Sequence, residues 1–181
     1  MGKPQAGIAW MPHQAGETAY DLSHLHPYHR EYVVAAKGNN PERRFSLHVS
    51  YGLHCFTRKP YAGEQAPPAG WYSDSRETRV FCPERWELSK QLPEIIGTLG
   101  QRQCRHTDGE EFVTLKVVQW GREFDYAVFF TVSKARKSQA DLNLFVNSAH
   151  ERYNRLKHKK PIRFDVILMN RFRNKPIKQP R

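Results

Sequence analysis

Two histidines stand close to residue types that can cleave a phosphodiester bond. His54 precedes Arg58 by four residues, and it follows a run in which His48 and Ser50 alternate with apolar residues. A histidine can move a proton near neutral pH, and an arginine can stabilise the charge that builds on a phosphate. The His-x-Ser pattern is a weak signal, because a two-histidine phosphoesterase needs a second such motif and the chain has none. Ordinary polar residues on the wet face of a strand are the alternative interpretation.

Ser148 and His150 form a second candidate pair, at the end of another alternating run. Continued alternation predicts that both side chains lie on the same side of the strand as Leu144. A polar pair that emerges where an apolar face stops often lines a cleft. Ser148 and His150 therefore join His54 and Arg58 as catalytic candidates. A strand end whose serine and histidine hydrogen-bond to a turn is the alternative.

Basic residues are candidates for binding rather than for catalysis. The net charge of the chain is +11, and residues 151–181 hold eleven Lys or Arg but only two acidic residues. Such a block is typical of proteins that bind a polyanion, and we expect RNA rather than DNA. A solvated tail that only keeps the protein soluble is the alternative. The candidate nucleic-acid-binding residues are Arg79, Lys157, Lys159, Lys160, Arg171 and Arg173.

Arg76 and Arg79 follow a loop-like segment rich in Pro, Gly and Ala. Either guanidinium could clamp a phosphate. A surface salt-bridge network with the neighbouring carboxylates is the simpler interpretation of the same pattern.

The cysteines and histidines do not form a recognisable metal motif. Cys55, Cys82 and Cys104 are widely spaced, which predicts reduced, mostly buried thiols in a reducing cytoplasm. The three histidines within residues 24–29 could hold a metal, but no cysteines at zinc-finger spacing accompany them. The phosphate-loop, dinucleotide-binding, zincin and nucleophile-elbow motifs are also absent. We therefore expect no metal site and no cofactor.

The elements that must position these residues follow from apolar spacing. Residues 45–57 alternate as a half-buried strand, with Gly52 at a bulge or turn. Residues 83–100 have helical spacing that Pro93 should kink or divide. Four strand-like runs follow, at residues 111–120, 124–134, 141–149 and 162–169. These patterns predict an α+β fold in which a helical segment packs on a mainly antiparallel sheet.

The chain length suits one domain. We expect an irregular, His- and Pro-rich segment over residues 1–42, a single α+β domain over residues 43–170 and a basic flexible tail over residues 171–181. No apolar run is long enough to cross a bilayer, and no secretory signal is recognisable. The expectation is a soluble cytoplasmic protein without a membrane partner.

Four short segments carry a family resemblance over most of the chain. They are Tyr20–Pro27, Leu53–Arg58, Leu88–Ile96 and Phe145–His150. These segments resemble bacterial proteins of uncharacterised role that are carried on mobile elements. A second, looser likeness is architectural, since a helical stretch followed by a four-stranded antiparallel meander looks like the barnase–EndoU–colicin–RelE group of ribonucleases. That group includes many toxins, and the likeness implies catalytic side chains on scattered strands, a role that Ser148, His150 and His54 would fit.

The leading hypothesis is an RNA-directed protein, in its most specific form a metal-independent endoribonuclease of toxin type. His54 and His150 would act as acid and base, while Arg58 and Arg79 would hold the scissile phosphate. Two alternatives stay open: a non-catalytic nucleic-acid-binding regulator, and a protein-interaction factor from a phage or plasmid. The hypotheses differ on whether His54, His150 and an arginine converge in one cleft.

Overall fold

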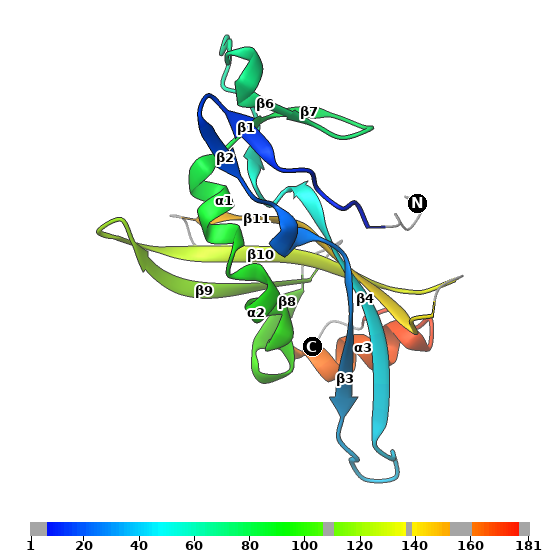
Figure 1. The fold of residues 1–181 in the computed structure, drawn as a ribbon. Coiled ribbons are helices and arrows are strands. Elements are labelled where there is room, and N and C mark those ends of the chain that lie inside the picture. The colour runs from blue at the N-terminus through cyan, green and yellow to red at the C-terminus, as the bar shows by residue number, and fades with distance from the viewer. Residues whose placement is uncertain (1–6, 107–110, 137–138, 153–160, 178–181) are drawn as a thin grey trace.

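The largest sheet of the molecule combines strands from both halves of the chain (Figure 1). The structure is a computed structural model that describes residues 7–106, 111–136, 139–152 and 161–177. In spatial order, the described strands of this sheet are β12 (Pro161–Arg163), β8 (Gln103–His106), β9 (Glu111–Gln119), β10 (Arg122–Lys134), β11 (Leu142–Arg152), β4 (Arg43–His54) and β3 (Tyr28–Val34). Neighbouring strands are antiparallel except for β11 and β4, which run parallel.

Two small sheets lie at one end of the large one (Figure 1). The first is a hairpin of β1 (His13–Ala15) and β2 (Thr18–Tyr20). The second has the order β5–β7–β6, with bounds Thr57–Arg58 for β5, Thr78–Phe81 for β7 and Trp71–Ser73 for β6. Short 3-10 helices occupy Ser23–Leu25, Pro68–Gly70 and Leu99–Gln101.

The helical segment consists of two abutting helices, as Pro93 predicts. Helix α1 spans Pro83–Ser89 and α2 spans Leu92–Gly97. Both helices carry a proline in the first turn, where a missing N–H leaves no hydrogen bond unmade. A third helix, α3 (Phe164–Phe172), lies close to the C-terminal end of the described chain.

The core gathers one face of the large sheet against the helices. Alternate residues of β4 from Phe45 to Tyr51 are buried there, together with alternate residues of β10 from Tyr126 to Val132. The ring of Phe164 from α3 packs edge-on against Phe130. These contacts confirm an α+β fold with a helical segment packed on a mainly antiparallel sheet.

The predicted strand over residues 162–169 is mostly helical. Only Pro161–Arg163 forms a strand, and α3 begins directly after it. Within α3 the buried residues are Phe164, Ile167 and Leu168, whereas Val166 is 42% exposed. That spacing is helical. The apolar run is so short that it fits both the two-residue period of a strand and the 3.6-residue period of a helix. The fourth strand of the meander is instead β8, which precedes β9.

Both chain ends are more ordered than the sequence suggests. The segment over residues 1–42, expected to be irregular, contains β1, β2 and β3, and β3 pairs with β4 throughout its length. In the expected flexible tail, α3 continues to Phe172 and Ile177 is buried. Residues 171–177 therefore belong to the folded domain, while residues 178–181 lie outside the described residues.

The three thiols agree with the sequence prediction. Cys55, Cys82 and Cys104 are free and buried. Burial raises the pKa of Cys55 and of Cys104 to about 12, so both remain protonated at neutral pH. Among the described helices, none has the length and apolar character that a membrane span requires.

Candidate functional site

A bulge in β11 decides which way Ser148 and His150 face. The register with β10 shifts at this point, because Val146 pairs with Phe130 but Ser148 pairs with Phe129. The extra residue reverses the alternation along the strand. Val146 is buried in the main core, whereas His150 stacks on Phe129, which belongs to a separate small cluster. Ser148 and His150 therefore lie opposite the core face, contrary to the predicted alternation.

The parallel pair of strands brings His54 to the same place. His54 is the last residue of β4, and its register partner on β11 is Ser148. Register partners on neighbouring strands present their side chains to the same face. His150 follows two residues further along β11. Three of the four catalytic candidates therefore meet at the ends of two adjacent parallel strands.

Glu77 holds the His54 ring in a fixed orientation. Oε1 of Glu77 lies 2.6 Å from Nε2 of His54, and Oε2 accepts a 3.4 Å hydrogen bond from Nη1 of Arg79. Burial by itself would raise the pKa of Glu77, but the hydrogen bonds and charges of His54 and Arg79 outweigh burial and lower it. Glu77 is therefore ionised at neutral pH, and its carboxylate accepts the hydrogen bond that orients the His54 ring.

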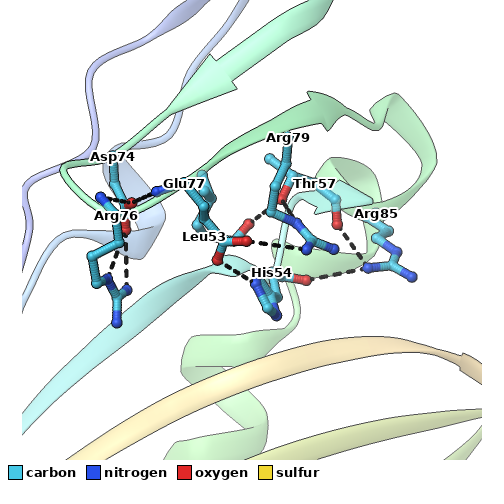
Figure 2. Close-up of polar contacts among 8 residues, drawn as sticks. All are labelled: Leu53, His54, Thr57, Asp74, Arg76, Glu77, Arg79 and Arg85. Atoms are coloured by element: carbon cyan, nitrogen blue, oxygen red, sulfur yellow. Dashed lines mark hydrogen bonds and ion pairs between the residues drawn. The ribbon is translucent and has the colours of Figure 1, made fainter. Parts of the chain in front are cut away.

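The turn before Glu77 is fixed by a buried carboxylate. The side chain of Asp74 is only 1% exposed, and Oδ1 accepts hydrogen bonds from the backbone N–H groups of Arg76 and Glu77. The other oxygen, Oδ2, pairs with the Arg76 guanidinium at 3.0 Å. Figure 2 shows Arg76 held by Asp74 on the side away from His54. Arg76 is therefore part of a salt-bridge network, as its simpler interpretation predicts.

Two arginines lie beside His54 (Figure 2). Nε of Arg79 donates to Oγ1 of Thr57 at 3.1 Å, and the Arg79 side chain is 13% exposed. Nη1 of Arg85, on α1, donates to the backbone carbonyl of Thr57 at 2.7 Å and lies 3.5 Å from that of His54. Among the described residues, no carboxylate forms a salt bridge with Arg85. Within the described residues, the hydrogen-bond acceptors of the Arg85 guanidinium are therefore backbone carbonyl groups.

His150 is kept neutral by its surroundings. Burial, followed by the positive charges of Arg85, Arg152 and His54, lowers the pKa of His150 to about 4. The same effect means that Arg85 and His54 are near enough to act on His150 electrostatically. At neutral pH the His150 imidazole is therefore uncharged and can accept a proton.

The arrangement suits a polyvalent oxyanion. The guanidinium groups of Arg79 and Arg85 supply positive charge beside Glu77 and His54, and neutral His150 can accept a proton. Within the described ranges, no three or more His, Cys, Asp or Glu side chains are grouped to hold a metal.

Several predicted site residues lie elsewhere. Arg58 makes two hydrogen bonds to Glu64, at 2.6 and 2.5 Å, and its guanidinium lies 4.3 Å from the centre of the Tyr61 ring. Arg171 donates to the buried Glu111 at 3.0 Å, and Arg173 is exposed after α3. Lys157, Lys159 and Lys160 fall outside the described residues.

His24 and His26 hydrogen-bond to different partners. Nε2 of His24 lies 2.8 Å from Oγ of Ser89, and Nε2 of His26 lies 3.0 Å from the carbonyl of Trp10. His29 packs beside His48, with ring centres 5.1 Å apart.

Sequence reasoning missed Arg85 and Glu77. Arg85 is three residues before Leu88 and seven before Leu92, so it occupies a position on the apolar stripe of the helical segment. A cation on that stripe is a signal for a partly buried charge with a specific role. Glu77 has the same strand parity as Arg79, which places both on one side of β7 and its preceding turn.

Comparison with known proteins gives one result. No curated protein and no solved structure matches the chain at a significant level. A family model, by contrast, matches residues 12–172, a range that includes β4, β7, α1 and β11 and therefore all the residues of the site. The chain belongs to the YjaZ family.

Proposed function

We propose that the protein binds RNA and cleaves it without a metal ion. The observation that carries the proposal is the convergence of His54, His150, Arg79 and Arg85 at the ends of β4 and β11. Two guanidinium groups match the geometry and charge of a phosphodiester. The excess of positive charge over residues 151–181 supports a polyanionic substrate.

The proposed reaction uses the 2′-hydroxyl of RNA as the nucleophile. Neutral His150 takes the proton of this hydroxyl, and the oxygen attacks the adjacent phosphorus. The bond from phosphorus to the 5′-oxygen breaks, and protonated His54 gives its proton to that oxygen. The products are a 2′,3′-cyclic phosphate and a 5′-hydroxyl end. Because DNA lacks the nucleophile, this chemistry selects RNA.

The remaining side chains support these two steps. Arg79 and Arg85 offset the extra negative charge of the transition state. Glu77 keeps His54 oriented through its hydrogen bond to Nε2, which leaves the Nδ1 edge to face the leaving oxygen. Ser148, beside His54, supplies a hydroxyl for a phosphate oxygen. A toxin-type role and an origin on a mobile element are part of this proposal through the family resemblance.

The test is cleavage of labelled RNA by purified protein in excess EDTA. His54→Ala and His150→Ala should each lower the rate by on the order of 10²–10⁴-fold, the usual loss for a general acid or base. Arg85→Met should cost on the order of 10²-fold or more, because it removes a charge that the transition state needs. His29→Ala is the matched control, since His29 is an exposed histidine that pairs with His48 instead.

Folding must be checked for every variant by circular dichroism and thermal melting. Wild-type protein that binds varied RNAs tightly but leaves them intact would replace the nuclease with a regulator that only binds. Protein that neither cuts nor binds nucleic acid would favour the protein-interaction factor. Cleavage that EDTA abolishes would contradict the metal-independent mechanism.

A further inference from the structure

A cavity of about 390 Å³ lies between the start of α1 and the hairpin that joins β9 to β10. In Figure 1 this hairpin extends past α1 on the same side of the molecule. The cavity has aromatic walls and a charged rim of both signs. Its lining residues are Pro83, Glu84, Trp86, Glu87, Trp120 and Arg122.

The first aromatic wall, Trp86, is held rigidly. Its indole N–H donates to the carbonyl of Asp21 at 2.7 Å, and the Tyr20 ring meets it edge-on with centres 4.9 Å apart. The ammonium of Lys90 lies 3.8 Å from the Trp86 ring centre and 2.7 Å from the Glu87 carboxylate. A ring fixed in this way is a preorganised wall of the cavity, and Lys90 covers one of its faces.

The second aromatic wall, Trp120, stands where folding alone does not favour it. Trp120 and Gly121 form the hairpin turn with φ of 51° and 71°. Two-residue turns of this kind prefer Asn-Gly, because a bulky side chain in the left-handed region is strained. Trp120 is nevertheless 45% exposed and borders the cavity. Strain of this kind at a cavity points to a binding role.

The charges around the cavity cancel. Glu87 is paired with Lys90, and Glu84 faces the same cavity as Arg122. A strongly charged occupant is therefore not favoured in either sign. The occupant that fits is neutral, planar and aromatic, with hydrogen-bond donors for the carboxylates and acceptors for the guanidinium.

We propose that this cavity binds a nucleobase of single-stranded RNA, a subsite that rests on the proposed function. Arg85 lies between Glu84 and Trp86 in the chain, so the phosphate-binding arginine and the cavity share one helical turn. A base next to the bound phosphate stacks on Trp120 and packs against Trp86, while its edge bonds to the carboxylates and to Arg122. Duplex RNA cannot offer such a base, so the substrate is single-stranded.

The deciding variant is Trp120→Asn, because asparagine suits the left-handed turn and removes the ring. With a single-stranded 2′-O-methyl RNA, which the proposed reaction cannot cleave, the affinity should fall on the order of 5- to 100-fold, the usual effect of one stacked base. The melting temperature should not fall. Val118→Ala is the matched control, since Val118 is 75% exposed on the same hairpin but does not line the cavity.

A second measurement separates this subsite from the nuclease proposal. Adenosine carries no phosphate, so its binding, followed by tryptophan fluorescence, should be lost in Trp120→Asn and kept in Arg85→Met. If wild-type protein fails to cleave RNA but shows this pattern, the base subsite stands and the cleavage mechanism fails. Unchanged affinity of Trp120→Asn for the RNA would overturn the subsite. Quenching by a lysine-rich peptide but not by adenosine or RNA would also overturn it.

Discussion

His150 owes its protonation state to its position in the molecule. An isolated histidine side chain has a pKa of about 6.5, whereas burial and then the charges of Arg85, Arg152 and His54 lower the pKa of His150 to about 4. Two histidines on neighbouring strands thus have different electrostatic surroundings. His54 contacts the Glu77 carboxylate, whereas His150 has only positive neighbours among the groups that shift its pKa.

This lowered pKa makes folding depend on pH in a defined direction. Between pH about 6.5 and about 4 the unfolded chain binds a proton on His150 and the folded chain does not, so stability should fall as the pH falls through this interval. His150→Gln should flatten the dependence, measured by urea unfolding at pH 7 and pH 5. His13 and His24 also have pKa values that burial lowers, so part of the slope should remain. An identical slope in wild type and variant would contradict this assignment.

For single residues, the sequence predicts candidates that the fold brings together, but it does not predict which arginines and carboxylates lie beside them. His54, Ser148 and His150 could be named because polar residues interrupt apolar alternation. Arg58 is close to His54 in the sequence, but its guanidinium hydrogen-bonds to Glu64 instead. Nearness in the sequence therefore does not predict that two side chains meet. Arg85 comes from a different element, and only tertiary packing brings α1 to the end of β4.

Among the elements, β4 and β11 carry the geometry of the site. Gly52 faces the β11 bulge, and a Cβ at this position would lie 3.0 Å from the Asn147 carbonyl oxygen and 3.0 Å from Cζ of Phe145. Glycine therefore permits the close approach of the two strands just before His54 and Ser148.

Gly52→Ala should consequently disturb the strand ends. We expect a loss of about 1–3 kcal/mol in the free energy of unfolding, the usual cost of overpacking, and slower RNA cleavage because His54 moves relative to Ser148. Gly100→Ala is the control, since a Cβ there meets no atom within 4 Å. Denaturant unfolding and the EDTA-resistant cleavage assay measure the two effects. Equal behaviour of the two variants would contradict the role of Gly52.

The sequence predicts a strand correctly where apolar and polar residues alternate over a long run. It does not where the run is short or where a bulge shifts the alternation. Alternate residues of β4 and β10 face the main core, while Ala127 and Phe129 of β10 form a separate cluster on the other face. The run over residues 162–169 is too short for its period to separate strand from helix. β11 contains no glycine or proline that would indicate a bulge. The sequence therefore does not predict to which face of the sheet Ser148 and His150 point.

For the molecule as a whole, the C-terminal residues combine charge with packing. Phe172 packs against Phe45 and lies 3.8 Å from the Arg43 guanidinium, and Arg171 bonds to Glu111. Deleting residues 171–181 would therefore remove core contacts as well as charge. Truncating a fully buried phenylalanine costs on the order of 3 kcal/mol, which is an upper limit for the partly buried Phe172.

A cleaner test of the charge is the double variant Arg173→Gln with Lys175→Gln, because both side chains are exposed. If both contact phosphates, the slope of log affinity against log salt should become shallower by about 1.4 for single-stranded RNA. The melting temperature should stay unchanged. An unaltered slope would mean that these charges only solvate the domain.

The parallel pairing of β4 with β11 has a consequence for the timing of synthesis. His54 is translated long before its register partner Ser148 and before His150, which lie on the late strand β11. The pairing of these strands closes a very long loop, which chain entropy opposes until the intervening strands have folded. The two histidines thus cannot meet before the chain has been made through β11. If the proposed reaction is correct, the nascent protein cannot cleave the messenger that encodes it until β11 has emerged from the ribosome and paired with β4.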